Sequence, residues 1–282
     1  MSGRLRHRYE RLLLAYPTDY RAAHGDEILS TLLEAARPTQ QFPSWRESSS
    51  LVLGGLRMRA RQAAKASPRR LWTDGLHLGV LLVVLVNLGG AMEMLLPPWT
   101  ALLAVGALAV LRGWSRTALA ATAIAGLAVA RPLLPAHLGL PWWLPGYGDW
   151  SAVGRYMWPA VVLAVLAWPG VGRLRPRSWW WLLLPAAQAA LPLVERPWSL
   201  IKAGAEVGLL LAVLVVAVGA LDPRPAIAAA VYLVPGLLYA AENIAEGAAS
   251  TRALAYWMVL AVLTATLAAA AWRIRRQQLT QR

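Results

Sequence analysis

Apolar runs alternate with short polar segments from about residue 76 to the basic C-terminal tail. Such runs predict buried or membrane helices, and about 20 apolar residues are long enough to cross a bilayer. Several runs are shorter, so flanking Trp and Arg must lie at the interface or the bilayer must thin locally. We predict eight crossings, with six or seven as alternatives, over residues 76–96, 99–111, 117–134, 156–171, 179–194, 199–221, 226–241 and 253–272.

The first 70 residues have a different pattern, in which apolar residues recur at helical spacing among many charges. This spacing predicts a helix over residues 4–16 that ends at Pro17. A second helix follows, with Thr18 or Asp19 as its cap, and Gly25 is expected to mark a bend or a break in it.

A third helix is predicted from Trp45, because Ser44 and Glu47 have the spacing of a capping box. Three helices in about 65 residues can bury only a small hydrophobic core. We therefore expect this head to need stabilising contacts with the membrane, with a second copy of the chain or with a partner. The domain prediction is therefore a helical head over residues 1–70, a transmembrane domain over 71–272 and a basic tail over 273–282.

Composition agrees with an all-α, polytopic membrane protein. Hydrophobic residues make up 58% of the chain and charged residues only 15%, whereas soluble domains have about half and about a quarter. Phe occurs once and Trp 15 times, and Trp is the aromatic residue that prefers the membrane interface. We therefore expect most of the chain to lie in lipid.

Charge predicts the orientation. A basic collar precedes the first crossing, and with eight crossings the head-side segments and this collar hold sixteen Lys and Arg against four on the other side. Because cytoplasmic loops carry such an excess, both termini are expected in the cytoplasm of a multi-pass cell-membrane protein. The net charge of +14 has no recognition-helix or RNA-binding signature beside it, so no direct nucleic-acid binding is expected. The collar consists of Arg57, Arg59, Arg61, Lys65, Arg69 and Arg70.

Motifs for catalysis or cofactors are missing from the sequence. There is no cysteine, which excludes disulfides and thiolate chemistry. No H-E-x-x-H, G-x-S-x-G or G-x-x-x-x-G-K-[ST] run occurs. We expect no enzyme activity, no cofactor and no metal site.

The longest connection between crossings, residues 131–156, is rich in Pro, Gly, Trp and Tyr. This composition argues against a continuous helix and favours a segment along the outer interface. Two interpretations stay open, an interfacial loop and a lid or sensor surface.

Ionisable groups within apolar runs are candidate functional residues, because burying a charge in lipid is costly. Lys202 and Glu206 are four residues apart and can pair on one helix face, as a structural pair or as part of a site. Glu242 and Glu246 have the same spacing. Two carboxylates on one helix face repel each other, so they suit a cation site, a proton-sensitive switch or a hydrated position at the membrane interface. With the predicted topology these groups face the outer leaflet. The candidate ligand or ion residues are Glu93, Lys202, Glu206, Glu242 and Glu246, with Asn87 and Gln188 as further polar residues in the spans.

The head carries a recognisable run, LLLAYPTDYR at residues 12–21 followed by HGDEIL at 24–29. It resembles the YPxxYRxxxGxE head of a family of uncharacterised, mostly actinobacterial, multi-pass membrane proteins, and it is similar to permease prefix domains. The resemblance covers about the first 60 residues. It implies a regulatory partnership, since such proteins are often encoded beside PadR-type repressors. The candidate docking residues are Tyr16, Tyr20, Arg21 and Glu27.

Two functional hypotheses follow. In the first, the chain is a regulatory or sensory membrane protein whose head docks a cytoplasmic protein, either a PadR-type regulator or an ATPase subunit. In the second, it is a transporter or permease component that uses the outward-facing polar cluster. A structural role for Tyr16 and Tyr20, as a helix stop with an aromatic pair, is the alternative to docking.

Overall fold

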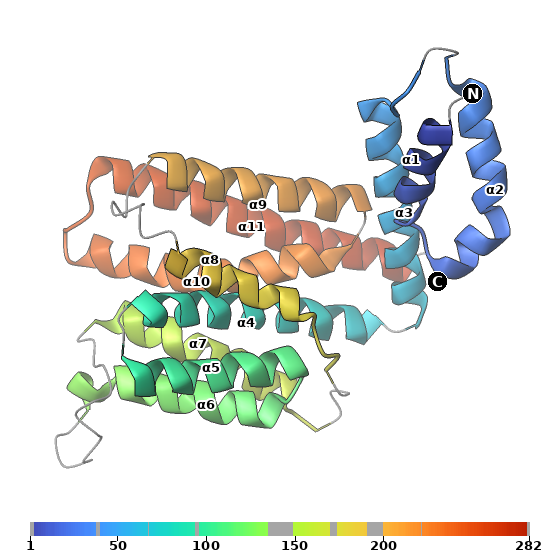
Figure 1. Ribbon diagram of the computed structural model, residues 1–282. Coiled ribbons are helices and arrows are strands. Elements are labelled where there is room, and N and C mark those ends of the chain that lie inside the picture. Colours follow the sequence, from blue (N-terminus) through green and yellow to red (C-terminus); the bar gives the residue numbers. More distant parts are fainter. Residues whose placement is uncertain are drawn as a thin grey trace.

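The computed structural model describes residues 3–37, 40–66, 68–93, 96–134, 149–169, 174–190, 200–220 and 222–280. All regular elements among these residues are helices, which confirms the predicted all-α class. Helices α1 to α3 form the head, and α4 to α11 lie alongside one another in a bundle with the head at one end (Figure 1).

The head consists of α1 (Gly3–Leu13), α2 (Thr18–Ala35) and α3 (Trp45–Ala66). Helix α1 ends at Leu13, earlier than the predicted end at Pro17. Pro17 instead holds the cap position of α2, and no side chain caps that helix. The expected bend at Gly25 is wrong, because α2 runs through it without a break. Gly25 is buried, and packing on one face stabilises a helix where glycine's low propensity would weaken it.

The predicted capping box at the start of α3 is confirmed. Ser44 N–H donates to Glu47 Oε2 at 2.9 Å, and Glu47 N–H donates to Ser44 Oγ at 3.2 Å. The buried Tyr9 hydroxyl of α1 donates to the same carboxylate at 2.8 Å. The hydrogen bonds from Ser44 and Tyr9 hold the pKa of Glu47 below its usual range, and burial together with Glu47 raises the pKa of Tyr9 to about 12. A local cap thereby also joins α1 to α3.

The bundle places one helical segment in each of the eight predicted apolar runs. Consecutive helices run in opposite directions, so that α4 begins and α11 ends near the head (Figure 1). The elements are α4 (Pro68–Glu93), α5 (Pro97–Arg112), α6 (Ser115–Val129), η1 (Arg131–Leu133), α7 (Trp150–Leu166), η3 (Trp179–Leu182), α8 (Leu183–Ala190), α9 (Leu200–Ala220), α10 (Pro223–Ala245) and α11 (Thr251–Thr280). Most of the long connection at 131–156 lies outside the described residues.

Three helical segments of the described chain are long and apolar enough to cross a membrane: Arg70–Met92, Pro223–Ala245 and Thr251–Ile274. Shorter apolar helices accompany them, at Pro97–Arg112, Ser115–Val129, Trp150–Leu166 and Gly204–Ala220. The membrane prediction is thus supported by three candidate spans, which is fewer than the eight crossings expected from the sequence.

The outer surface of the bundle is apolar. Large aliphatic side chains are exposed along its helices, and apolar exposure of this extent is unusual for a soluble monomer. Exposed tryptophans lie near the helix ends or, for Trp272, near the end of the candidate span Thr251–Ile274, and tryptophan is enriched at such positions at a membrane interface. The exposed aliphatic residues include Val105, Leu108, Ile124, Leu127, Val161, Val165, Leu209, Leu211, Val215, Val218, Val259 and Val262, and the exposed tryptophans include Trp114, Trp150, Trp168, Trp179, Trp180 and Trp272.

Helices α4 and α10 approach closely because two glycines, four residues apart, face α10. A Cβ on Gly75 would lie 3.0 Å from Ile227 Cβ, and one on Gly79 would lie 2.6 Å from Val231 Cβ. Small residues at this spacing let two helix backbones meet in lipid, where dispersion contacts rather than the hydrophobic effect drive association. We call this contact the α4–α10 seam.

Replacing Gly79 with Ala should lower the melting temperature of the detergent-purified protein by about 2–10 °C, because the added methyl group overpacks the seam by about 1–3 kcal/mol. Gly236→Ala in α10 is the matched control, since a Cβ there meets no atom within 4 Å. Differential scanning fluorimetry measures both. Equal melting temperatures for the two variants would contradict the seam.

Candidate functional site

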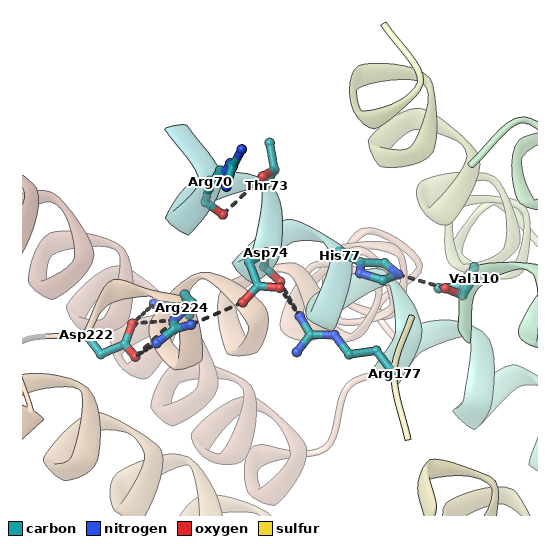
Figure 2. A network of polar contacts seen from close by, with 8 residues as sticks. All are labelled: Arg70, Thr73, Asp74, His77, Val110, Arg177, Asp222 and Arg224. Carbon is teal, nitrogen blue, oxygen red and sulfur yellow. Dashed lines mark hydrogen bonds and ion pairs between the residues drawn. The ribbon is translucent and has the colours of Figure 1, made fainter. Parts of the chain in front are cut away.

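A cluster of four charged residues joins three segments at the head end of the bundle (Figure 2). Arg177 Nη2 donates to Asp74 Oδ1 at 2.5 Å and to the Asp74 carbonyl at 3.1 Å. Arg224 Nη1 donates to Asp74 Oδ2 at 3.3 Å, so one carboxylate accepts from two guanidinium groups. Arg224 is also held by Asp222 through Nη2 at 2.7 Å and Nε at 3.0 Å. We call these four residues the Asp74 cluster.

Helix α5 joins the same region through its C-terminal carbonyl groups. Arg177 N–H donates to the Leu111 carbonyl at 2.8 Å. His77, which is fully buried in α4, has Nε2 2.8 Å from the Val110 carbonyl, a distance that requires Nε2 to be the donor (Figure 2). Gly113 ends α5 in the left-handed conformation with φ of 76°, so the chain can turn back here and leave these carbonyls accessible.

The Asp74 cluster balances two positive against two negative charges in side chains that are only 15–29% exposed. Such groups are costly to desolvate alone, and each here has a partner of opposite charge. The cluster therefore fixes the segment before η3 and the start of α10 against α4. This geometry indicates a structural role, in which the ion pairs hold the three segments together.

Sequence reasoning missed the Asp74 cluster. Arg177 and Arg224 are among the sixteen head-side Lys and Arg residues, whose pattern in the sequence indicates only the orientation of the chain, and no sequence pattern points to Asp74 or His77. The available signal was an acidic residue between the basic collar and the first apolar run. Its partners lie 103 and 150 residues away, which no local pattern reveals.

Of the predicted polar site, Glu242 has a specific partner in another helix. Its two carboxylate oxygens accept hydrogen bonds from Trp150 N–H at 2.7 Å and Ser151 N–H at 2.9 Å. These are free N–H groups at the start of α7, where a helix favours a negative charge. Glu246, four residues further on, is exposed at the C-cap of α10. The two carboxylates therefore do not share one site in the described structure.

Glu206 lies on α9 and accepts a hydrogen bond from Tyr256 of α11 at 2.5 Å. Its predicted partner, Lys202, and the further candidate Glu93 lie in helices whose side chains at these positions are outside the described residues. Within the described part of the chain, no group of three or more His, Asp or Glu residues is arranged to hold a metal ion.

A second polar contact in the bundle joins α4 to α7. Arg155 Nε donates to Asn87 Oδ1 at 2.7 Å, and Asn87 is buried. Asn87 also lines a small cavity together with Thr122 and Tyr156, about the size of one water molecule. Tyr232 of α10 lies within electrostatic range of both Arg155 and Glu206, so polar groups from α4, α7, α9 and α10 share one region of the bundle.

The candidate docking residues of the head lie along α2 and the turn before it. Tyr16 stacks on Tyr20 with ring centroids 5.5 Å apart, and its hydroxyl packs against Gly54 of α3. Burial and the neighbouring Tyr20 raise the pKa of Tyr16, so it is a neutral packing residue. The rings of Tyr20 and His24 are in contact, with their centroids 4.7 Å apart, and His24 Nδ1 lies 3.8 Å from Oε2 of the exposed Glu27 carboxylate. Arg21 is half-buried, with its stem against Gly25.

The head is attached to the bundle through α3. Arg57 donates through Nε and Nη2, at 3.1 and 2.8 Å, to the carbonyl of Gly219 in the last turn of α9. A cation at a helix C-terminus is favourable because the last carbonyls are unpaired and carry partial negative charge. Leu53, one turn earlier in α3, packs against the same glycine. A basic-collar residue, Arg57, therefore fastens the head to α9.

Comparison with known proteins finds no matching family model, no matching curated protein and no matching solved structure.

Replacing Asp74 with Asn should destabilise the protein by about 1–3 kcal/mol, because two guanidinium groups then face each other without the shared carboxylate. Thermal unfolding in detergent measures the loss. Arg116→Gln, an exposed charge at the same end of the bundle, is the control and should have no effect. The double variant Asp74→Asn, Arg177→Gln should be less destabilised than the sum of the two single variants, because both changes remove the same contact. If the two single losses of stability simply add, Asp74 and Arg177 do not interact.

Proposed function

We propose that this chain is a regulatory membrane protein in which α4 to α11 provide eight crossings, both termini lie in the cytoplasm, and the head docks a cytoplasmic protein. The observation that carries the proposal is the placement of the head. Its α3 side is fastened to the arginine-rich end of the bundle by Arg57, while α2 lies on the side away from the bundle (Figure 1).

Topology is supported by the alternation of helix directions and by charge. The head and the C-terminal end of α11 lie at the same end of the bundle, as an even number of crossings requires (Figure 1). Arginines of the described connections gather at that end, and an excess of positive charge favours the cytoplasmic side. The shorter helices of 15 to 17 residues need flanking tryptophans at the interface, which Trp114 and Trp168 can supply.

Docking is supported by the outward face of α2. Tyr20, His24 and Glu27 follow one another at spacings of four and three residues, so they share one helix face. This face combines aromatic and charged groups and makes no hydrogen bond to α3 or to the bundle among the described residues. The resemblance of this run to heads encoded beside PadR-type repressors makes a regulator of that type, or an ATPase subunit, the partner that we propose.

A regulatory function also needs a link between the head and the membrane. Helix α9 provides one, because its last turn binds Arg57 of the head while Glu206, near its other end, binds Tyr256 of α11. A shift of α9 along its axis would alter both contacts. We propose this helix as the route by which the bundle and the head influence each other.

Cysteine labelling tests the topology, since the chain has no native cysteine. In intact cells, a membrane-impermeant maleimide should label Ala248→Cys, between α10 and α11, and should label Arg11→Cys of α1 only after permeabilisation. Both positions are exposed, so reactivity reports the side of the membrane. Labelling of both in intact cells, or the reverse pattern, would contradict the proposed orientation.

Affinity purification of the full-length protein from native membranes tests the docking. A PadR-type regulator or an ATPase subunit, identified by mass spectrometry, should co-purify with the unmodified chain. The double charge reversal Arg21→Glu, Glu27→Lys should reduce its recovery at least about tenfold, the effect of losing a few charged contacts at an interface. Arg11→Glu on α1 is the matched control and should retain it. The docking hypothesis fails if no such protein is recovered or if all three chains recover it equally.

A further inference from the structure

The tip of the head, residues 40–46, exposes two large aromatic side chains. Trp45 is 83% exposed, more than any other large apolar side chain in the described chain, and Phe42 is 64% exposed. Neither is part of the head core, which Leu5, Tyr9 and Leu13 of α1 build with α2 and α3. Aromatic groups this exposed are typical of binding surfaces.

In the proposed topology, the position of α3 brings this tip to the level of the membrane interface. Leu53 and Arg57 contact Gly219, the penultimate residue of α9. Helix α9 has 21 residues and is therefore about 31 Å long, close to the thickness of the hydrocarbon core. Because α3 crosses the end of such a helix, it lies where phospholipid headgroups would begin.

The tip also extends beyond the bundle. Trp45 precedes Leu53 by eight residues, which is about 12 Å along α3, whereas a helix with its side chains has a radius of only about 5–6 Å. In Figure 1 the N-terminal end of α3 projects past α9. Arg46 precedes Leu53 by seven residues, so it lies on the same face of α3 as Leu53 and Arg57, the face toward the bundle end. In the proposed topology, the part of this face that extends beyond α9 is directed toward lipid headgroups.

The charge exposed at the tip is positive, because the neighbouring carboxylate of Glu47 is already bound within the head. The Glu47 carboxylate is held by Ser44 N–H and the Tyr9 hydroxyl. The Arg8 guanidinium stacks on Phe42, 3.3 Å from the ring centroid, and Arg46 makes no ion pair with any described residue. Two arginines beside two exposed aromatic rings complement an anionic headgroup layer.

We propose that the tip is an interfacial anchor, in which Phe42 and Trp45 insert among headgroups and Arg8 and Arg46 bind the phosphates of anionic phospholipids in the cytoplasmic leaflet. This inference rests on the proposed topology, and it concerns a different surface from the α2 docking face. The anchor would hold α3 parallel to the membrane and thereby set the direction in which α2 faces the cytoplasm.

Single-cysteine nitroxide labels on the full-length protein in nanodiscs test the anchor. The reporter is Gln41→Cys, which is exposed beside Phe42. Glu34→Cys on α2 serves as the aqueous control, and Val262→Cys on α11 serves as the lipid control. Collision with a water-soluble nickel chelate is measured by power saturation, in phosphatidylcholine alone and with about one third phosphatidylglycerol.

In the anionic nanodiscs, accessibility of the Gln41→Cys label to the chelate should fall about fivefold relative to phosphatidylcholine, since each Arg near an anionic surface contributes attraction of that order. The added changes Trp45→Ser and Arg46→Gln should restore high accessibility. If the tip label stays as accessible as the Glu34→Cys label in both lipids while the Val262→Cys label is protected, the anchor is overturned and the membrane insertion stands. An accessible Val262→Cys label would overturn the insertion itself.

Discussion

The close contact of α4 with α10 is the constraint on which the rest of the structure depends. In lipid there is no hydrophobic force between helices, so association requires backbones near enough for dispersion contacts and a few polar bonds. Gly75 and Gly79 permit that approach, and Asp74 adds bonds to Arg177 and Arg224 at the same level. The seam holds the bundle together, because every other bundle helix except α6 packs on one of its two members. Helix α4 contacts α5, α7 and α8, helix α10 contacts α7, α9 and α11, and α6 packs on α5 and α7.

Polar groups inside the bundle are used mainly to position helices. Glu242 caps α7, Glu206 binds Tyr256, and Arg155 binds Asn87, each joining two helices that are far apart in sequence. A buried polar group without a partner costs free energy, so such pairs specify one arrangement among the many that apolar packing alone permits. Their conversion into a transport site would require these bonds to break.

The head combines a fixed side with two free surfaces. Arg57 and Leu53 hold α3 on the end of α9, and Tyr9 and Glu47 hold α1 on α3. Because α3 is bound in this way, α2 lies on the side of the head away from the bundle. The aromatic tip lies at the N-terminal end of α3. In the proposed function a partner on α2 and lipid at the tip would act on one rigid unit, and α9 would transmit its position to the bundle.

Helices and their approximate limits could be predicted from the sequence alone. Apolar runs and helical spacing are local patterns, and the Ser44–Glu47 capping box spans only three residues. The sequence also predicted Glu206 and Glu242 as notable residues, since acids in apolar runs stand out. Their partners depended on tertiary structure, because Tyr256 and Trp150 reach them only after helices distant in the chain have packed. The same holds for the Asp74 cluster: a charge in a loop shows its sign in the sequence, but packing alone determines which opposite charge neutralises it.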